Sequence, residues 1–234
     1  MQPAAPAAGA AQVRVSRQVL DRRRILGAAL ELVDGEGLEA LSMRKLGGLL
    51  GVEAMALYHY FPSKGVLVDG LVALVLARLS LPTVDSEGDW AAVVRQVAAS
   101  FRALGAAHPH LFPLLATIGL DNPASLPPAE AVLAVLTQAG LPAREAFDAF
   151  LALKSYVVGY TLWSIGDRIL AQRGDPATAV AIEVDQARFP LVAEIVRGRA
   201  ERRLDSEFEA GLNLLIEGIQ ARLSTSAAAP TRAG

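Results

Sequence analysis

Hydrophobic positions recur at helical spacing along nearly the whole chain, and almost no stretch alternates as a strand would. In the first half, this pattern predicts helices over residues 16–34, 43–50, 53–59, 63–79 and 89–107. In the second half, it predicts helices over residues 109–119, 127–139, 142–166, 189–196 and 205–223. The sequence therefore predicts an all-α protein.

The segments between these patterns suggest how the chain is divided into domains. Residues 1–13 are rich in Ala, Pro and Gly, and we expect them, like residues 224–234, to be disordered tails. The composition of Pro82–Asp89 is that of a linker. We therefore expect one helical domain over residues 14–81 and a second over 82–223, with little order in 167–187.

Residues 42–61 have the layout of a helix-turn-helix, the motif that reads DNA with its second helix. Met43, Leu46 and Leu49 give the first short helix one apolar face. Gly51 follows at the point where the chain must turn left-handed, a conformation that glycine adopts at least cost. We expect Ser42 and Ser63 to be the N-caps of the helices that follow them.

Charge is unevenly distributed along the chain, whose formal net charge is −2. The first 80 residues carry nine Lys and Arg against seven Asp and Glu, a balance of +2, and the remainder carries 13 against 17, a balance of −4. Arg14, Arg17 and Arg22–Arg24 are opposed locally by Asp21 alone. This cluster is either a phosphate-binding surface or simply a solvated helix face.

Composition and motifs argue against several classes of protein. The chain has no cysteine, no apolar run of membrane-spanning length and no recognisable signal peptide, and we expect it to be cytoplasmic. It contains no nucleophile elbow, phosphate-binding loop or zinc-protease motif, so we expect no enzyme activity and no catalytic residue. Its three histidines form no metal-binding face, and we expect no metal and no cofactor.

The first sixty-odd residues resemble the DNA-binding domain of the tetracycline-repressor (TetR) family of bacterial transcription regulators. The matching positions are Ile25, Ala28, Ala29, Leu32, Gly37, Leu41, Arg44, Leu46, Leu49, Gly51, Val52, Leu57, Tyr58, Tyr60, Phe61, Lys64 and Leu67. The second domain resembles that family's helical regulatory domain more loosely. The resemblance implies a DNA-binding head joined to a ligand-binding and dimerisation domain.

The resemblance also implies which residues contact DNA. They are Ser42, Arg44, Tyr58, Tyr60 and Lys64, together with Glu53, Ala54, Met55 and Ala56 at the start of the recognition helix. Arg44 is the only strong bidentate base reader among them, whereas Ala54, Met55 and Ala56 offer only apolar contact, for example to thymine methyl groups. Each tyrosine has an alternative role as a core aromatic.

Two apolar stripes, on the long helix and on the last helix, are candidates for a dimer interface. In the family, the matching helices of two subunits form a four-helix bundle. The candidate residues are Phe147, Phe150, Leu151, Val158, Leu162, Phe208, Gly211, Leu212, Leu215 and Ile219. Part of each stripe has an alternative role in the core of a single chain.

The resemblance further implies a ligand pocket in the second domain. The candidate lining residues are Phe101, His108, His110, Phe112, Leu115, Tyr156, Tyr160 and Trp163, each of which has an alternative role as plain core. Their balance suits a hydrophobic or aromatic small molecule. Leu115 stands where tetracycline repressors have a magnesium-holding histidine, which argues against tetracycline as the ligand. Lys154 could pair with Glu209 or Glu217, bind an anionic ligand, or simply extend to solvent.

We therefore expect a homodimeric regulator that binds a palindromic DNA operator, most simply as a repressor, and leaves it when a small molecule binds. The alternative is a helical protein that binds small molecules or partners without specific DNA binding. The sequence leaves open which effector and which operator are bound. It also leaves open whether the protein represses or activates transcription, and whether the ligand acts as an inducer or as a corepressor.

Overall fold

The computed structural model describes residues 19–81, 89–173, 184–199 and 204–228. All regular secondary structure in these ranges is helical, which confirms the predicted fold class. The first group of helices is α1 (Arg22–Glu36), α2 (Met43–Leu50), α3 (Ala54–Tyr58) and α4 (Lys64–Leu76). The second group is α5 (Trp90–Ala107), α6 (Phe112–Thr117), α7 (Leu126–Gln138), α8 (Ala143–Arg173), α9 (Pro190–Arg199) and α10 (Leu204–Ala228). Short 3₁₀ turns, not predicted from the sequence, cover Leu38–Ala40 and Pro123–Ser125.

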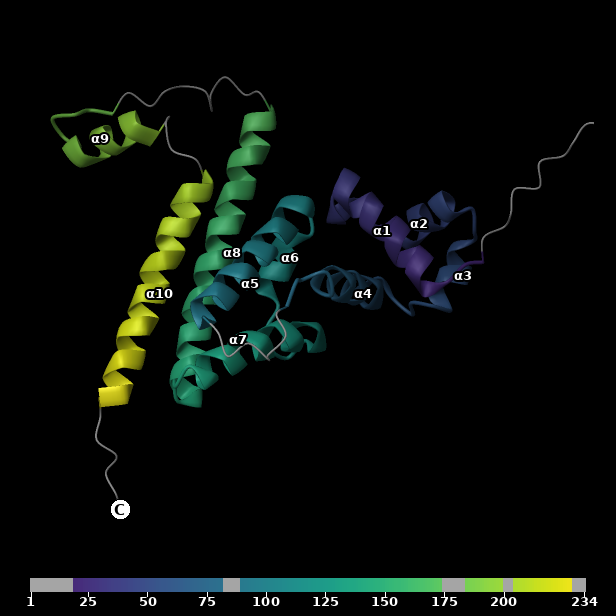
Figure 1. Cartoon of the computed structure of the whole chain (residues 1–234). Coiled ribbons are helices and arrows are strands. Elements are labelled where there is room, and N and C mark those ends of the chain that lie inside the picture. The colour runs from purple at the N-terminus through teal and green to yellow at the C-terminus, as the bar shows by residue number, and fades with distance from the viewer. Residues whose placement is uncertain (1–18, 82–88, 174–183, 200–203, 229–234) are drawn as a thin grey trace, which may run out of the picture.

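The helices form an elongated molecule with different groups at its two ends (Figure 1). Helices α1–α3 form one end, and α4 leads from them toward the second group. At the other end, the long helices α8 and α10 run side by side in opposite directions, with α5 and α7 packed against α8. Helix α9 stands apart from the other helices, near the C-terminal end of α8 and the N-terminal end of α10 (Figure 1).

Local signals explain where most helices begin. The hydroxyls of Ser42 and Ser63 accept hydrogen bonds from the backbone N–H groups three residues later, so both predicted N-caps are confirmed. The carboxylate of Asp89 accepts a hydrogen bond from the N–H of Ala91 and caps α5 in the same way. Pro113 lies in the first turn of α6, where its missing N–H costs nothing.

Three predicted boundaries are wrong. Helix α1 begins at Arg22, because Asp21 is extended and its carboxylate caps the N–H of Arg24. Helix α8 continues to Arg173, through part of the segment expected to have little order. Helix α10 continues to Ala228, so residues 224–228 are not part of a disordered tail. Alanine favours helix there, and the Thr225 hydroxyl donates back to the carbonyl of Ala221. The predicted tail 1–13, linker residues 82–88 and residues 229–234 lie outside the described residues.

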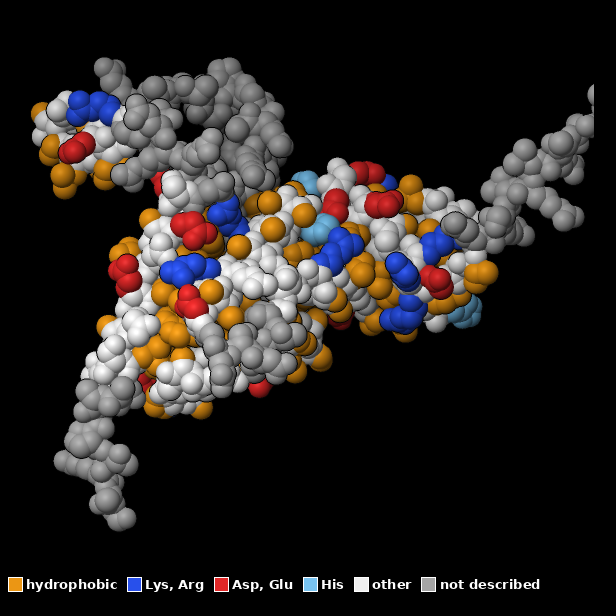
Figure 2. Space-filling view, in the orientation of Figure 1, with side chains coloured by type: hydrophobic (Ala, Val, Ile, Leu, Met, Phe, Trp, Pro, Cys, Tyr) orange, Lys and Arg blue, Asp and Glu red, His pale blue; other side chains and the backbone are white. Residues whose placement is uncertain are grey.

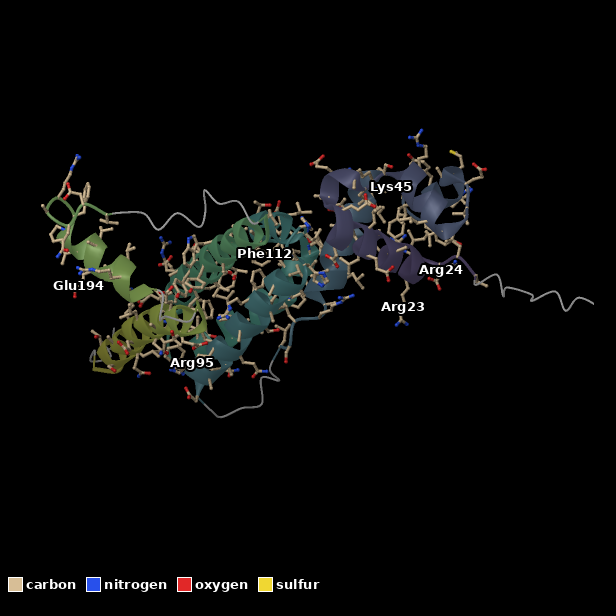
Figure 3. The ribbon with its side chains drawn as sticks, turned by 90° about the horizontal axis from the view of Figure 1, so that it is seen from above. Arg23, Arg24, Lys45, Arg95, Phe112 and Glu194 are labelled. Carbon is tan, nitrogen blue, oxygen red and sulfur yellow. The ribbon has the colours of Figure 1, made fainter. Side chains whose placement is uncertain are left out.

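The hydrophobic core does not divide where the linker composition suggests. One core cluster holds the buried residues of α1–α4 and also Leu104, Leu111, Phe112 and Leu115 from α5 and α6. Figure 3 shows Phe112 inside the molecule, where its side chain is fully buried. The second cluster joins α5, α7, α8 and α10 around Phe208. The end of α5 and the buried side of α6 therefore share a core with the first group of helices, and Ile165 of α8 joins the same cluster.

Helices α8 and α10 approach each other closely at Gly211. A Cβ atom at this position would overlap the hydroxyl of Tyr156 on α8. That hydroxyl donates a 2.8 Å hydrogen bond to the carbonyl of Phe208, and burial, with a smaller contribution from Glu209, raises the pKa of Tyr156. Gly211 thus serves a contact within one chain. No helix in the described ranges is both long and apolar enough to cross a bilayer.

Candidate DNA-binding surface and ligand pocket

The tight turn between α2 and α3 depends on two glycines. Gly51 has φ of 68°, the left-handed conformation predicted for it, and its N–H closes the end of α2. Gly47 lies where α2 meets the turn, and a Cβ there would stand 2.8 Å from the carbonyl oxygen of Val52. These contacts set the angle at which α3 leaves α2, and so confirm the helix-turn-helix.

Four of the predicted DNA contacts have long, exposed side chains that could reach DNA from this end of the molecule. They are Arg44 on α2, Met55 and Tyr58 on α3, and Lys64 at the first position of α4. Met55 is 70% exposed and is therefore accessible at the start of the recognition helix. Glu53 is also exposed, while Ala54 and Ala56 are half-buried.

Two predicted contacts have other uses within the chain. The Ser42 hydroxyl is exposed but accepts the capping hydrogen bond from Lys45. The Tyr60 hydroxyl donates a 2.7 Å hydrogen bond to the carbonyl of Leu20, so it is not available to donate to a phosphate. Tyr60 therefore fits the alternative of a structural aromatic, because its hydroxyl holds the backbone just before α1.

Figure 2 shows basic side chains at this end of the molecule, as well as on the second group of helices, and those at this end do not all point to solvent. Arg22 lies 4.3 Å above the centre of the Phe61 ring and donates to the carbonyl of Tyr60, so it ties α1 to the end of α3. Lys45 pairs with Glu36. Arg23 projects outward from α1 (Figure 3) and is exposed, whereas Arg14 and Arg17 lie outside the described residues.

The second group of helices encloses an apolar pocket with about 760 Å³ of space between its walls, its open mouth included. Helices α4–α8 all contribute to the wall, with Leu76 from α4, Phe101 from α5 and Leu115 from α6. The pocket thus lies where the second group of helices meets the C-terminal end of α4.

Of the predicted ligand contacts, the structure brings Phe101 and Leu115 into this pocket. Phe112 packs edge-on against Phe101, with ring centres 5.4 Å apart, but lies in the core behind the wall. His110 is exposed beside Gly37. His108 is buried between two charged side chains of the DNA-binding head.

Three aromatic residues of α8 that were predicted to contact the ligand lie away from this pocket. Tyr156 and Tyr160 pack on Phe208 of α10, with ring centres 5.6 and 5.4 Å apart, and Trp163 packs edge-on against Tyr160. At about 100° per residue, these positions lie on the opposite side of α8 from Lys154, which lines the pocket. Helical spacing alone did not distinguish the two sides of α8.

The candidate dimer residues separate into three groups. Phe208, Leu212 and Ile219 are buried within the single chain, and Leu215 is half-buried in the same cluster. Phe150 and Val158 line the pocket. Phe147, Leu151 and Leu162 remain exposed on α8, and Leu214, which the predicted stripe missed, is 71% exposed on α10.

His108 joins the two parts of the molecule. Its Nδ1 lies 2.8 Å from a carboxylate oxygen of Asp34 on α1, and its Nε2 lies 3.2 Å from a guanidinium nitrogen of Arg78, just after α4. Since guanidinium groups only donate, Nε2 accepts from Arg78 and the Nδ1–H donates to Asp34. The end of α5 is thereby tied to both α1 and α4. Among the described residues, no three His, Asp or Glu side chains cluster as metal ligands would.

Family models match both parts of the chain. Residues 25–71 match the model for bacterial regulatory proteins of the tetR family, and residues 81–223 match the model for the tetracyclin repressor-like C-terminal domain.

Similar proteins and structures support the same assignment. The chain is 32% identical to the HTH-type transcriptional repressor DrrR1 of Streptomyces coeruleorubidus, over 78% of this chain and 67% of that protein. It is 31% identical to the class C tetracycline repressor protein of Escherichia coli, over 88% of this chain and 94% of that protein. The structure of the Streptomyces coelicolor TetR family protein ActR in complex with actinorhodin is similar, with a TM-score of 0.75 and 26% identity. That match covers 88% of this chain and 99% of ActR.

The helix-turn-helix geometry, the apolar pocket above it and these matches over nearly the whole chain lead to one conclusion. The chain belongs to the TetR family of bacterial transcriptional regulators.

Proposed function

We propose that this protein represses transcription by binding a palindromic operator as a homodimer, and that a hydrophobic or aromatic small molecule in the apolar pocket releases it. The observation that carries this proposal is the course of α4. Lys64 begins the helix on the exposed DNA-binding end, and Leu76 ends it in the pocket wall. Thirteen residues span ~20 Å at 1.5 Å per residue, so one short helix links the two sites.

The proposed DNA contacts are Arg44, Met55, Tyr58 and Lys64, with Ser42 and the first turn of α3 close to them. Arg44 is the candidate reader of guanine, and Met55 the candidate contact to a thymine methyl. Lys64 adds its charge to the N–H groups at the start of α4, a combination that favours a phosphate.

A dimer is proposed because one helix-turn-helix reads only half of a palindrome. Two recognition helices must lie ~34–36 Å apart to enter successive major grooves on one side of the duplex. Phe147, Leu151 and Leu162 of α8 and Leu214 of α10 are apolar side chains that are exposed in the single chain, and a second copy would cover them.

Release requires that the effector bind the free conformation better than the DNA-bound one. A coupling of ~1–3 kcal/mol between the two sites is typical. The pocket wall includes Leu115 of α6, which is also part of the core of the DNA-binding head. A molecule that displaces α6 would therefore move α4 and change the distance between the recognition helices of the two subunits.

The test is fluorescence anisotropy of the full-length protein with duplexes tiled across the DNA flanking its own gene, at two salt concentrations. We expect tight binding to one palindromic duplex, with affinity that falls steeply as salt rises. Arg44→Ala should weaken binding by about 10–100-fold, as expected from losing a bidentate contact worth ~1–3 kcal/mol. Arg144→Ala, an exposed arginine on α8, is the matched control and should leave binding unchanged.

Weak binding that is the same for every duplex at both salt concentrations would contradict the proposal. The alternative, a helical protein that binds small molecules without specific DNA binding, would then be favoured. Full operator specificity in Arg44→Ala would show instead that another residue reads the bases.

A further inference from the structure

The pocket has a single charged group in an otherwise apolar wall. Lys154 of α8 is the only charged side chain among the described lining residues, and Ser125 is the only other one with a polar side chain. The Ser125 hydroxyl already donates to the carbonyl of Gly119 at 2.7 Å. Lys154 therefore supplies the only side-chain donor of the described wall that a ligand can use.

The ammonium group of Lys154 is only partly satisfied by the protein. Its Nζ donates a 2.7 Å hydrogen bond to the carbonyl of Ile118, at the end of α6, and it forms no ion pair with a carboxylate of the described residues. It does not reach Glu209 or Glu217 on α10, because it lies on the other side of α8. An ammonium has three donors, and the Ile118 carbonyl uses one of them.

A half-buried charge without a counter-ion favours a ligand that supplies one. Burying an unpaired charge is unfavourable, and an anionic oxygen at Nζ would offset this cost with a strong, charge-assisted hydrogen bond. The rest of the wall, including Val94, Phe101, Leu115 and Val132, offers only carbon to the ligand.

We propose that the effector is a singly anionic apolar molecule, with one acidic oxygen group at Lys154 and its hydrocarbon body against the apolar wall. This inference rests on the proposed function, since it names the ligand class of the same pocket. A neutral hydrocarbon would leave the Lys154 charge uncompensated, and a polyanion would place further charges against an apolar wall.

The position of Lys154 also explains how an acid would act on α6. The same Nζ that would bind the acid holds the carbonyl at which α6 ends, and Leu115 of α6 lies in both the pocket and the core of the head. Binding of the anion therefore takes place at the contact that fixes the end of α6.

The test uses matched probes with the full-length protein, by isothermal titration calorimetry without DNA. The probes are 2-naphthylacetate and decanoate, each compared with its neutral amide of nearly the same shape. We expect wild type to bind each acid at least about tenfold tighter than its amide, the ratio expected for a charge-assisted hydrogen bond. Lys154→Met should remove this preference by weakening the acid alone, whereas Lys154→Arg should keep it.

Three outcomes would overturn the inference. They are equal binding of acid and amide by wild type, an acid preference that survives in Lys154→Met, and no binding of any probe up to about 1 mM, the weak limit of specific affinity. Retained amide binding in Lys154→Met shows that the pocket is intact. Because the readout is ligand binding without DNA, failure of operator binding would count against the proposed function and not against this assignment.

Discussion

Gly47 and Gly48 are neighbours on α2 with very different surroundings. A Cβ at position 47 would meet the backbone of Val52 and Ala54, at 2.8 Å from the nearest oxygen, whereas a Cβ at position 48 would meet nothing within 4 Å. The contact at Gly47 is with backbone, which cannot rotate away as a flexible side chain can. Gly47 is therefore required by the close approach of α2 to the turn, and Gly48 is not.

Gly47→Ala should destabilise the protein by ~1–3 kcal/mol, because the turn must shift to admit a methyl group, and operator binding should fall with it. Gly48→Ala is the control and should stabilise α2 by up to ~1 kcal/mol, since alanine favours helix. Urea denaturation and DNA binding of both variants check this. Equal effects of the two substitutions would contradict the role given to Gly47.

Residues that act on their own neighbours were predictable, and residues that act across the fold were not. Ser42, Gly51 and Ser63 cap or end helices through atoms a few positions away, and the structure confirms each one. Tyr60 and His108 were assigned to DNA and ligand, but their partners Leu20 and Asp34 are 40 and 74 positions distant. Sequence spacing contains no information about such partners.

At the scale of the element, α8 has three differently used sides. Lys154 and Val157 line the pocket, Tyr156 and Tyr160 pack on α10, and Leu151 is exposed. The sequence shows a long helix that is apolar on much of its surface. A fully buried helix and a helix in a dimer interface both have this pattern, so the pattern does not distinguish them. Only the position of α10 distinguishes the sides.

We predict that Leu151→Asp combined with Leu214→Asp converts a dimer into a folded monomer. Both side chains are exposed in the single chain, so the charges should disrupt only a contact between subunits. Sedimentation equilibrium should give twice 24.6 kDa for wild type and 24.6 kDa for the double variant, with unchanged helical circular dichroism.

Leu126→Asp is the matched control for this substitution. Leu126 is also an exposed apolar residue, but it begins α7, where an acidic side chain is tolerated near the N-terminal end of the helix dipole. It should remain dimeric. A wild-type monomer at micromolar concentration, or a double variant that still dimerises, would rule out this surface as the interface.

At the scale of the whole molecule, the boundary between the DNA-binding head and the second group of helices is a packed core bridged by one histidine. Phe112 and Leu115 lie in the same cluster as the buried residues of α1 and α4. His108 adds directional bonds to Asp34 and Arg78 across that boundary. Packed cores deform in discrete steps, so a movement of α6 should be transmitted to the head.

His108→Ala should lower the free energy of unfolding by ~1–3 kcal/mol, since it leaves Asp34 and Arg78 without their partner. It should also reduce the change in DNA affinity that an effector causes, because α5 is no longer tied to α1. His110→Ala is the control, since His110 is exposed, and should change stability by less than ~0.5 kcal/mol. Thermal unfolding and effector titration of the DNA complex measure both effects, and full coupling in His108→Ala would refute the bridge.

By itself, the sequence determined the helices, their caps, the helix-turn-helix and the family. These depend on hydrophobic period, capping residues and turn glycines, which act over a few positions. The tertiary structure alone decided that His108 bridges the domains, that Tyr60 is held by Leu20, and that Lys154 faces an apolar pocket. The physical reason is that a side chain's partner across the fold depends on how the helices pack, and the period of one helix does not specify which of its sides meets which neighbour.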